Sequence, residues 1–136
     1  MQRFTVVIYS LRTIFSHPIN GIGLGVRTFN PYTGYRMETH NTFLQVGTYA
    51  GLFALIVFVI IIFYIFYYGV RTYKIIKGTR EGVILEGYTW AFSSCVLGML
   101  ILNGLFLKHF WMLGGLIVSY YLITRKGKYN IENIKK

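Results

Sequence analysis

The sequence predicts an all-α integral membrane protein in which three transmembrane helices follow an interfacial amphipathic helix and an extracytoplasmic loop. Composition is the first observation behind this prediction, because 54% of the 136 residues are hydrophobic and only 13% are charged. The second is a stretch from residue 41 to residue 70 that contains no Asp, Glu, Lys or Arg. About 20 apolar residues in a helix are enough to cross the hydrocarbon core of a bilayer, so this stretch is long enough to span one.

Residues 1–45 are predicted to form an extracytoplasmic amphipathic helix and a glycine-rich loop. In a helical arrangement, one face collects six apolar side chains: Phe4, Val7, Ile8, Leu11, Ile14 and Phe15. Val6 is the exception, because it falls on the polar side. No small-residue cleavage pattern follows this run, so a signal peptide is not expected. The helix should end before Pro18, because a residue that precedes proline is disfavoured in the helical conformation.

The segment from Pro18 to Gly25 reads P-I-N-G-I-G-L-G. Alternating glycines permit backbone conformations that other residues avoid, and they let another group approach the peptide units closely. Two interpretations stay open, an anion-binding nest and a plain flexible turn. The spacing is not that of the dinucleotide-binding fingerprint. Residues 26–37 are predicted to be loop, because Asn-Pro and Thr-Gly pairs interrupt them.

Residues 46–124 are predicted to form a three-span membrane region, with helices at about 46–70, 88–107 and 109–124. The third span is short, so it is expected to begin within the preceding turn or to lie where the bilayer is thin. Tryptophan and tyrosine side chains near the ends of the spans are typical interfacial anchors. Gly47 and Gly51 form a small-xxx-small pair, which would let another helix pack closely against the first span.

Basic residues predict the orientation. The linker 71–86 and the tail 125–136 are rich in Lys and Arg, so both are expected in the cytoplasm, which leaves the N-terminal segment outside. These flanks account for most of the formal net charge of +10, which in a soluble protein would suggest a nucleic-acid partner. No nucleic acid is therefore expected. Cys95 is the only cysteine, which excludes a disulfide framework and a Cys-rich zinc site.

His40 is the first candidate for chemistry, because its imidazole lies where the polar segment meets the first span and can exchange a proton near neutral pH. Around it, the motifs resemble the C-terminal part of the O-antigen ligase and polymerase family of bacterial multi-pass envelope glycosyltransferases. The resemblance is carried by P-x-x-G-x-G-x-G (Pro18, Gly21, Gly23 and Gly25), then by H-N-T-F-L from His40, and by Gly51 ahead of a long apolar helix. The chain departs from the family in having Val7 where a tryptophan is common, a compact loop between the two motifs, and far fewer spans.

The resemblance implies transfer of an undecaprenyl-diphosphate-linked glycan to a hydroxyl of an acceptor glycan or lipid A core. The transfer would take place on the outer face of the cytoplasmic membrane, without a metal or cofactor. His40 would activate the acceptor hydroxyl, a role typically worth roughly 10²–10⁴-fold in rate. Arg3 would hold the diphosphate, whose developing charge needs fixed cations. Arg27, Arg36 and Asn41 are further substrate-binding candidates. Neither Arg27 nor Arg36 has a firm motif match.

Each assignment has a structural alternative. His40 could cap or anchor the first span, Asn41 is a preferred N-cap type, and the outer arginines could be solvated or could hold lipid phosphate. Three spans cannot enclose a groove for a polyprenyl carrier, so the chain is expected to be a truncated protein that lacks N-terminal helices. The second interpretation is a small multi-span membrane subunit or scaffold without catalysis, whose Gly47 and Gly51 face would pack on a partner. The motifs do not distinguish ligation from polymerisation.

Overall fold

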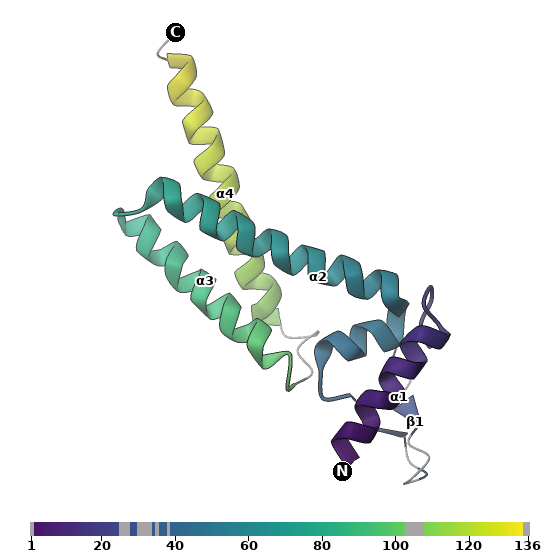
Figure 1. Ribbon diagram of the computed structural model, residues 1–136. Helices are drawn as coiled ribbons and strands as arrows, with labels where there is room; N and C mark the ends of the chain where they lie inside the picture. The colour runs from purple at the N-terminus through teal and green to yellow at the C-terminus, as the bar shows by residue number, and fades with distance from the viewer. Residues whose placement is uncertain are drawn as a thin grey trace. The chain divides into compact units, whose positions relative to one another are not determined.

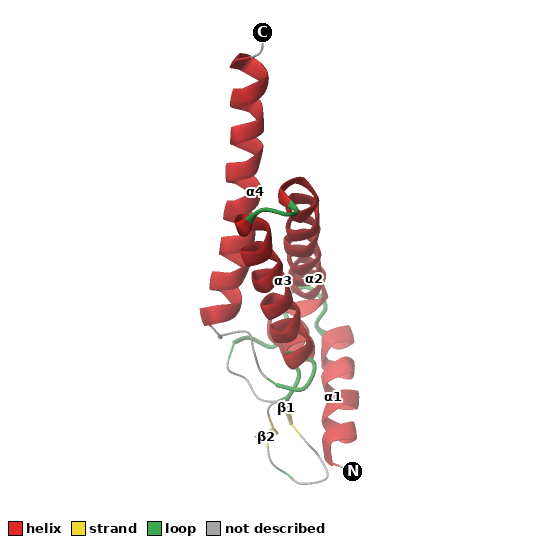
Figure 2. Cartoon of the chain, turned by 90° about the vertical axis from the view of Figure 1, so that its left-hand side faces the viewer, coloured by secondary structure: helices red, strands yellow, loops and turns green. Residues whose placement is uncertain are grey.

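The computed structural model describes residues 2–24, 28–29, 34, 36–37, 39–102 and 108–134. Its elements in chain order are α1 (Gln2–Ser16), β1 (Thr28–Phe29), β2 (Arg36–Met37), α2 (Thr42–Ile76), α3 (Arg80–Gly98) and α4 (Lys108–Ile134) (Figure 1). Helices account for most of the described residues (Figure 2), so the predicted all-α class is confirmed at that level. The chain divides into two compact units, the first made of Met1–Ile60 with Val96–Phe106 and the second of Ile61–Cys95 with Leu107–Lys136.

Two short strands replace part of the loop that the sequence predicted for residues 26–37. They pair antiparallel, with Thr28 opposite Met37 and Phe29 opposite Arg36. β-Branched and aromatic residues such as Thr28 and Phe29 favour extended backbone. Gly34, between the strands, has a φ of 68°, a conformation that glycine adopts without steric cost where a chain reverses.

α1 ends at Ser16, two residues before the proline, as predicted. Its buried side is a stripe at a spacing of four residues, where Val6, Ser10 and Ile14 are 7%, 0% and 2% exposed. The Ser10 hydroxyl donates to the Val6 carbonyl at 2.8 Å, which satisfies the one polar group in this stripe. Val6 therefore shares a side with Ser10, as predicted, and this side is the packed one.

The remaining apolar residues of α1 are exposed: Phe4, Val7, Ile8, Leu11 and Phe15. Ile14 was predicted to share this face, but it packs instead against Gly47 of α2, where a Cβ atom would lie only 2.7 Å from its Cδ1. α1 thus has a narrow side that packs within the unit and a broad apolar side that does not. Such a helix has the form of one that lies at a membrane interface.

α2 is not a single straight helix. Gly51 has φ 88° and ψ 176°, which divides α2 into segments 42–50 and 52–76, and the change of direction is visible in Figure 1. The longer segment extends about 37 Å at 1.5 Å per residue, more than the roughly 30 Å of a hydrocarbon core. The sequence predicted a span that begins near residue 46, whereas the straight part begins at residue 52.

Within the described residues, α2 is the one helix long and apolar enough to cross a membrane. Only 28% of its most apolar 18-residue stretch is buried within the chain. The core helix of a soluble protein would be mostly buried. Phe53, Val57 and Phe63 are 63%, 54% and 70% exposed, and such a continuous apolar surface suits hydrocarbon better than water. Helices α3 and α4 overlap the second and third predicted spans in part, and a membrane crossing by either of them stays a prediction.

The second unit packs the later part of α2 with α3 and α4 around aromatic side chains. Phe92 and Phe110 are fully buried, and their rings stack with centroids 5.0 Å apart at an interplanar angle of 18°. Phe66 meets Phe92 edge-on at 5.3 Å. Gly114 lets α4 approach closely, because a Cβ atom there would lie 3.0 Å from Ile65 Cδ1. Small residues at helix contacts have this effect in membrane proteins as well.

The turn that follows α1 forms hydrogen bonds with the backbone on both sides of the break in α2. The Leu52 N–H, which has no helical partner because of the break at Gly51, donates to the Pro18 carbonyl at 2.7 Å. Two N–H groups of the turn donate in the opposite direction, to carbonyls at the end of segment 42–50: Ile22 to Thr48 at 2.9 Å and Gly23 to Tyr49 at 3.0 Å. The turn and the break therefore satisfy backbone groups that each alone would leave unpaired.

Glycine is required at both places where the turn and α2 come into contact. A Cβ atom on Gly21, whose φ is +60°, would lie 2.5 Å from the Tyr49 carbonyl oxygen. A Cβ atom on Gly51, whose φ is +88°, would lie 2.5 Å from the Pro18 carbonyl oxygen. Both neighbours are backbone atoms, which cannot move aside as the end of a side chain can. The two glycines thus permit the close approach of the turn to the helix.

We expect Gly51→Ala to lower the free energy of unfolding by at least about 2 kcal/mol. The backbone of Gly51 has a positive φ with an extended ψ, which costs residues other than glycine roughly 1–3 kcal/mol before the overlap with Pro18 is added. Thermal unfolding of the detergent-solubilised protein measures this change. The matched control is Gly87→Ala in α3, where no atom lies within 4 Å of the added Cβ. Alanine favours a helix over glycine by about 1 kcal/mol, so the control should be neutral or stabilising. Equal unfolding temperatures for the two variants would contradict this role of Gly51.

Candidate functional site

The motif residues fall at two ends of the short segment 42–50. At the break, Pro18 contacts Gly51, and Gly21 and Gly23 contact Tyr49. His40, in contrast, precedes the first turn of α2. The nine residues of segment 42–50 separate these ends by about 13 Å along the helix axis. Because both motifs are joined to one rigid segment, the position of each fixes the position of the other.

The remaining candidates lie partly beyond what the structure describes. Gly25 and Arg27 are outside the described residues. Arg3 lies in α1 and Arg36 in β2, but their side chains are outside the described part of the chain. The roles of these three arginines in holding a diphosphate stay predictions.

The glycine turn does not form an anion nest from the N–H groups that the structure describes. The Gly21 N–H donates to the His17 carbonyl at 3.0 Å, and the Ile22 and Gly23 N–H groups are used at the break. An anion nest needs successive N–H groups that are free to face a ligand. The N–H groups of Gly21, Ile22 and Gly23 are therefore not available for an anion nest, and those of Ile22 and Gly23 bond this part of the turn to α2.

Asn41 is the N-cap of α2. Its Oδ1 accepts a hydrogen bond from the Leu44 N–H at 3.0 Å, which is the bond that defines this cap. Its Nδ2 donates to the Leu100 carbonyl at 2.9 Å. Both polar groups of the amide thus have partners within the protein, so the N-cap alternative describes this side chain. Contact of Asn41 with a substrate stays a prediction.

Further hydrogen bonds join the start of α2 to the residues after α3. The Thr42 N–H donates to the Met99 carbonyl and its Oγ1 to the Leu102 carbonyl, both at 2.9 Å. Thr42 is fully buried, and Met99 is 1% exposed. Together with the Asn41 bond, these contacts fix the backbone on the C-terminal side of His40 against a segment about 60 residues later in the chain.

Sequence reasoning missed the role of residues 99–102, which were predicted to lie inside the second span. α3 instead ends at Gly98, and the chain turns there, since the N–H groups of Ile101 and Leu102 donate back to the Gly98 carbonyl at 3.0 and 2.9 Å. Gly98 is the last residue of this helix and does not have the positive φ of a usual glycine stop signal. The apolar residues that follow it concealed the end of the helix.

The imidazole of His40 is exposed, whereas the preceding Thr39 is only 6% exposed. The chain therefore leaves the packed interior at His40 and returns into it at Thr42. This arrangement presents an exposed imidazole next to a backbone that hydrogen bonds of Asn41 and Thr42 hold on its C-terminal side. A general base needs this combination of access and fixed position.

A polar face lies along segment 42–50, and it was not predicted. Gln45 and Thr48 are 5% and 1% exposed, and the Thr48 hydroxyl donates to the Leu44 carbonyl at 2.7 Å. Gln45 Nε2 donates to the Tyr49 hydroxyl at 3.4 Å. Gln45 Oε1 has no partner among the described residues, and an unpaired buried acceptor costs about 1–3 kcal/mol.

Within the described ranges, no three His, Cys, Asp or Glu side chains cluster in a way that could hold a metal ion. Comparisons with known protein families, with curated proteins and with solved structures found no match. The functional interpretation therefore depends on the motifs and on the geometry around His40.

Two substitutions of Asn41 test its two side-chain hydrogen bonds separately. We expect Asn41→Ala to lower the free energy of unfolding by about 1–2 kcal/mol through loss of the cap and to speed hydrogen exchange at the Leu44 amide. Asn41→Asp keeps an acceptor for Leu44 but loses the donor to Leu100, so it should retain slow exchange at Leu44. Hydrogen–deuterium exchange with mass spectrometry measures both. Equal protection of Leu44 in the wild type and in the alanine variant would contradict the N-cap assignment.

Proposed function

We propose that this chain acts as the corresponding part of an O-antigen ligase- or polymerase-like glycosyltransferase. It would move a glycan from undecaprenyl diphosphate to a hydroxyl of an acceptor glycan or lipid A core at the outer face of a bacterial cytoplasmic membrane. One observation carries the proposal: the glycine turn and the H-N-T-F-L segment, the two motifs of the resemblance, are joined through the break at Gly51. Their combination thus corresponds to one structural unit.

In this proposal His40 accepts the proton of the acceptor hydroxyl as the oxygen attacks the anomeric carbon of the carrier-linked sugar. The bond between that carbon and the diphosphate oxygen breaks, and the lipid diphosphate leaves with the bonding electrons. Arg3, Arg27 and Arg36 would stabilise the charge on the leaving group, since arginine binds phosphate through a planar fork of donors. The protonated imidazole then returns its proton to water.

The proposed membrane arrangement has α2, α3 and α4 crossing the bilayer, residues 1–45 outside and the basic tail in the cytoplasm. The length and exposed apolar surface of residues 52–76 support the first crossing. The exposed apolar side of α1 supports its placement in the outer interface, where it would keep the glycine turn and His40 near the headgroups. A lipid-linked donor would then meet His40 at the membrane surface.

The alternative of a noncatalytic subunit or scaffold loses its predicted docking face. Gly47 and Gly51 were expected to receive a partner helix, but Ile14 of α1 covers Gly47, and the backbone of Pro18 and Ile19 covers Gly51. The small residues of this face are used inside the chain.

We expect His40→Ala to reduce glycan transfer by about 10²–10⁴-fold, because the acceptor hydroxyl would lose its base. Transfer is measured in membranes that contain the protein, with a carrier-linked glycan and an acceptor, from the gel ladder of the products. His17→Ala is the matched control, because His17 is also an exposed histidine of the first unit. It should retain transfer within a few fold, and both variants should insert into membranes normally. Undiminished transfer by the His40 variant would reject the proposed base.

A further inference from the structure

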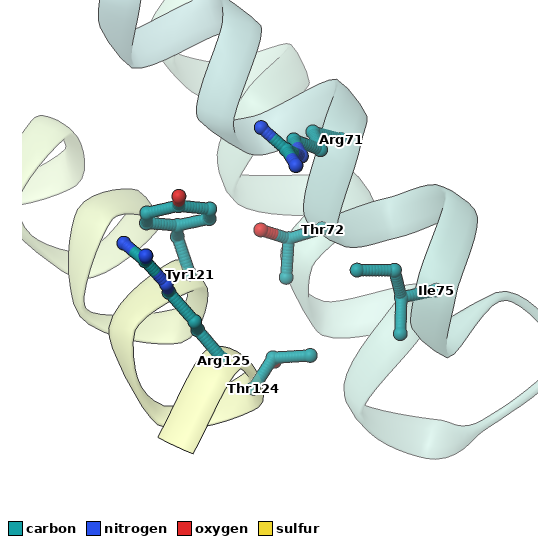
Figure 3. Close-up of a pocket in the computed structure, with 6 residues that line it drawn as sticks. All are labelled: Arg71, Thr72, Ile75, Tyr121, Thr124 and Arg125. Atoms are coloured by element: carbon teal, nitrogen blue, oxygen red, sulfur yellow. The ribbon is translucent and has the colours of Figure 1, made fainter. Parts of the chain in front are cut away.

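A second polar site lies in the unit made of Ile61–Cys95 and Leu107–Lys136. It is a cavity of about 370 Å³ between the C-terminal part of α2 and α4, lined by Arg71, Thr72, Ile75, Tyr121, Thr124 and Arg125 (Figure 3). This volume is within the range of about 300–1,000 Å³ found for small-ligand sites. Two of the six lining residues are arginines and none is acidic, so the cavity favours an anion.

Thr72 provides the second observation, because its hydroxyl has no partner although the residue is fully buried. Hydroxyls elsewhere in these helices usually donate to the carbonyl four residues earlier, as do those of Ser10, Thr13, Thr48, Thr89, Ser93, Ser94 and Ser119. Thr72 does not do so, and Figure 3 shows its oxygen directed toward the space between Arg71 and Tyr121. A buried hydroxyl with no partner is costly unless a ligand supplies one.

A tyrosine one helical turn earlier on α2 holds Arg71 in place. Arg71 Nη1 donates to the Tyr67 hydroxyl at 2.9 Å, and its guanidinium carbon lies 5.8 Å from the centroid of the same ring. This contact uses one of the five N–H donors of an arginine and leaves the others for a ligand. Tyr121, on the opposite wall, stacks on Tyr68 with centroids 4.3 Å apart. Part of the site is therefore organised before any ligand binds.

We propose that this cavity binds a phosphate group, with Arg71 and Arg125 as charged donors and Thr72 as a neutral one. Arginine forks match the geometry of phosphate oxygens, and the hydroxyl can donate to a third oxygen. The phosphate belongs either to the headgroup of an anionic lipid or to a soluble phosphate, since both present the same oxygens. The inference concerns residues remote in sequence from His40 and does not depend on glycan transfer.

Binding to the purified full-length protein in detergent tests the site with two probes. Phosphatidylglycerol, with phosphatidylcholine as the uncharged control, represents the lipid source, and inorganic phosphate, with chloride as the control, represents the soluble source. Native mass spectrometry counts bound lipid, and the shift in unfolding temperature with concentration gives the affinity for either probe. Tighter binding of phosphatidylglycerol than of inorganic phosphate assigns a lipid headgroup to the cavity, and the reverse assigns a soluble phosphate.

The double variant Arg71→Gln/Arg125→Gln should weaken binding of the preferred probe by about tenfold to a hundredfold, as expected for loss of hydrogen bonds to a charged group. Lys74→Gln/Lys126→Gln is its matched control, because it removes the same charge from exposed positions on the same two helices that do not line the cavity. The control should bind within about twofold of the wild type if general surface charge contributes little. Equal loss in the two double variants, or no binding of either probe by the wild type, would overturn the proposal.

Thr72→Val supplies a test that does not remove charge. Valine has nearly the shape of threonine without its hydroxyl, so the empty protein should unfold at the same or a higher temperature, because an unpaired buried group is removed. Affinity for the preferred probe should nevertheless fall by about tenfold. A variant that binds as tightly as the wild type would show that the hydroxyl does not face the ligand, and this result would overturn its part in the site.

Discussion

The region around His40 depends on one constraint, the backbone hydrogen bonds between the turn after α1 and the break in α2. A glycine with positive φ interrupts a strongly apolar helix, and the unpaired groups that result would each be costly away from water. The turn after α1 removes that cost by pairing Leu52 with Pro18 and by donating to Thr48 and Tyr49. The helical hydrogen bonds lost at one point are thereby replaced by bonds that hold α1, the turn and segment 42–50 together.

Several features of this arrangement follow from local sequence signals. The end of α1 before Pro18, the start of α2 after Asn41 and the long apolar helix were predictable from proline, capping and hydrophobicity. The packed side of α1 was not, since Val6, Ser10 and Ile14 form a stripe that is recognisable only when Gly47 is known to face it. Gly51 was predicted to be a helix contact because its spacing from Gly47 fits that motif. Its positive φ depends on a turn thirty residues earlier, which no local pattern reveals.

In the candidate site, too, the residues themselves were predictable from the local sequence, whereas their distant partners were not. The histidine and the capping asparagine were recognised from type and order, but the partners of Asn41 and Thr42 lie in residues 99–102. Those residues looked like the interior of a span because they are apolar, and backbone carbonyls leave no signature in sequence. The cavity lined by Arg71 and Arg125 was likewise hidden, since its two arginines were explained by the positive flanks of a membrane protein.

The side of the membrane on which residue 40 lies is the most direct test of the proposed chemistry, because the proposed transfer takes place at the outer face. Cys95 is the only cysteine, so a His40→Cys substitution in a Cys95→Ala background gives one thiol at the site. A membrane-impermeant maleimide added to intact spheroplasts is expected to label this thiol without permeabilisation. Labelling only after the membrane is permeabilised would place residue 40 in the cytosol and contradict the assignment of His40 as the base for glycan transfer.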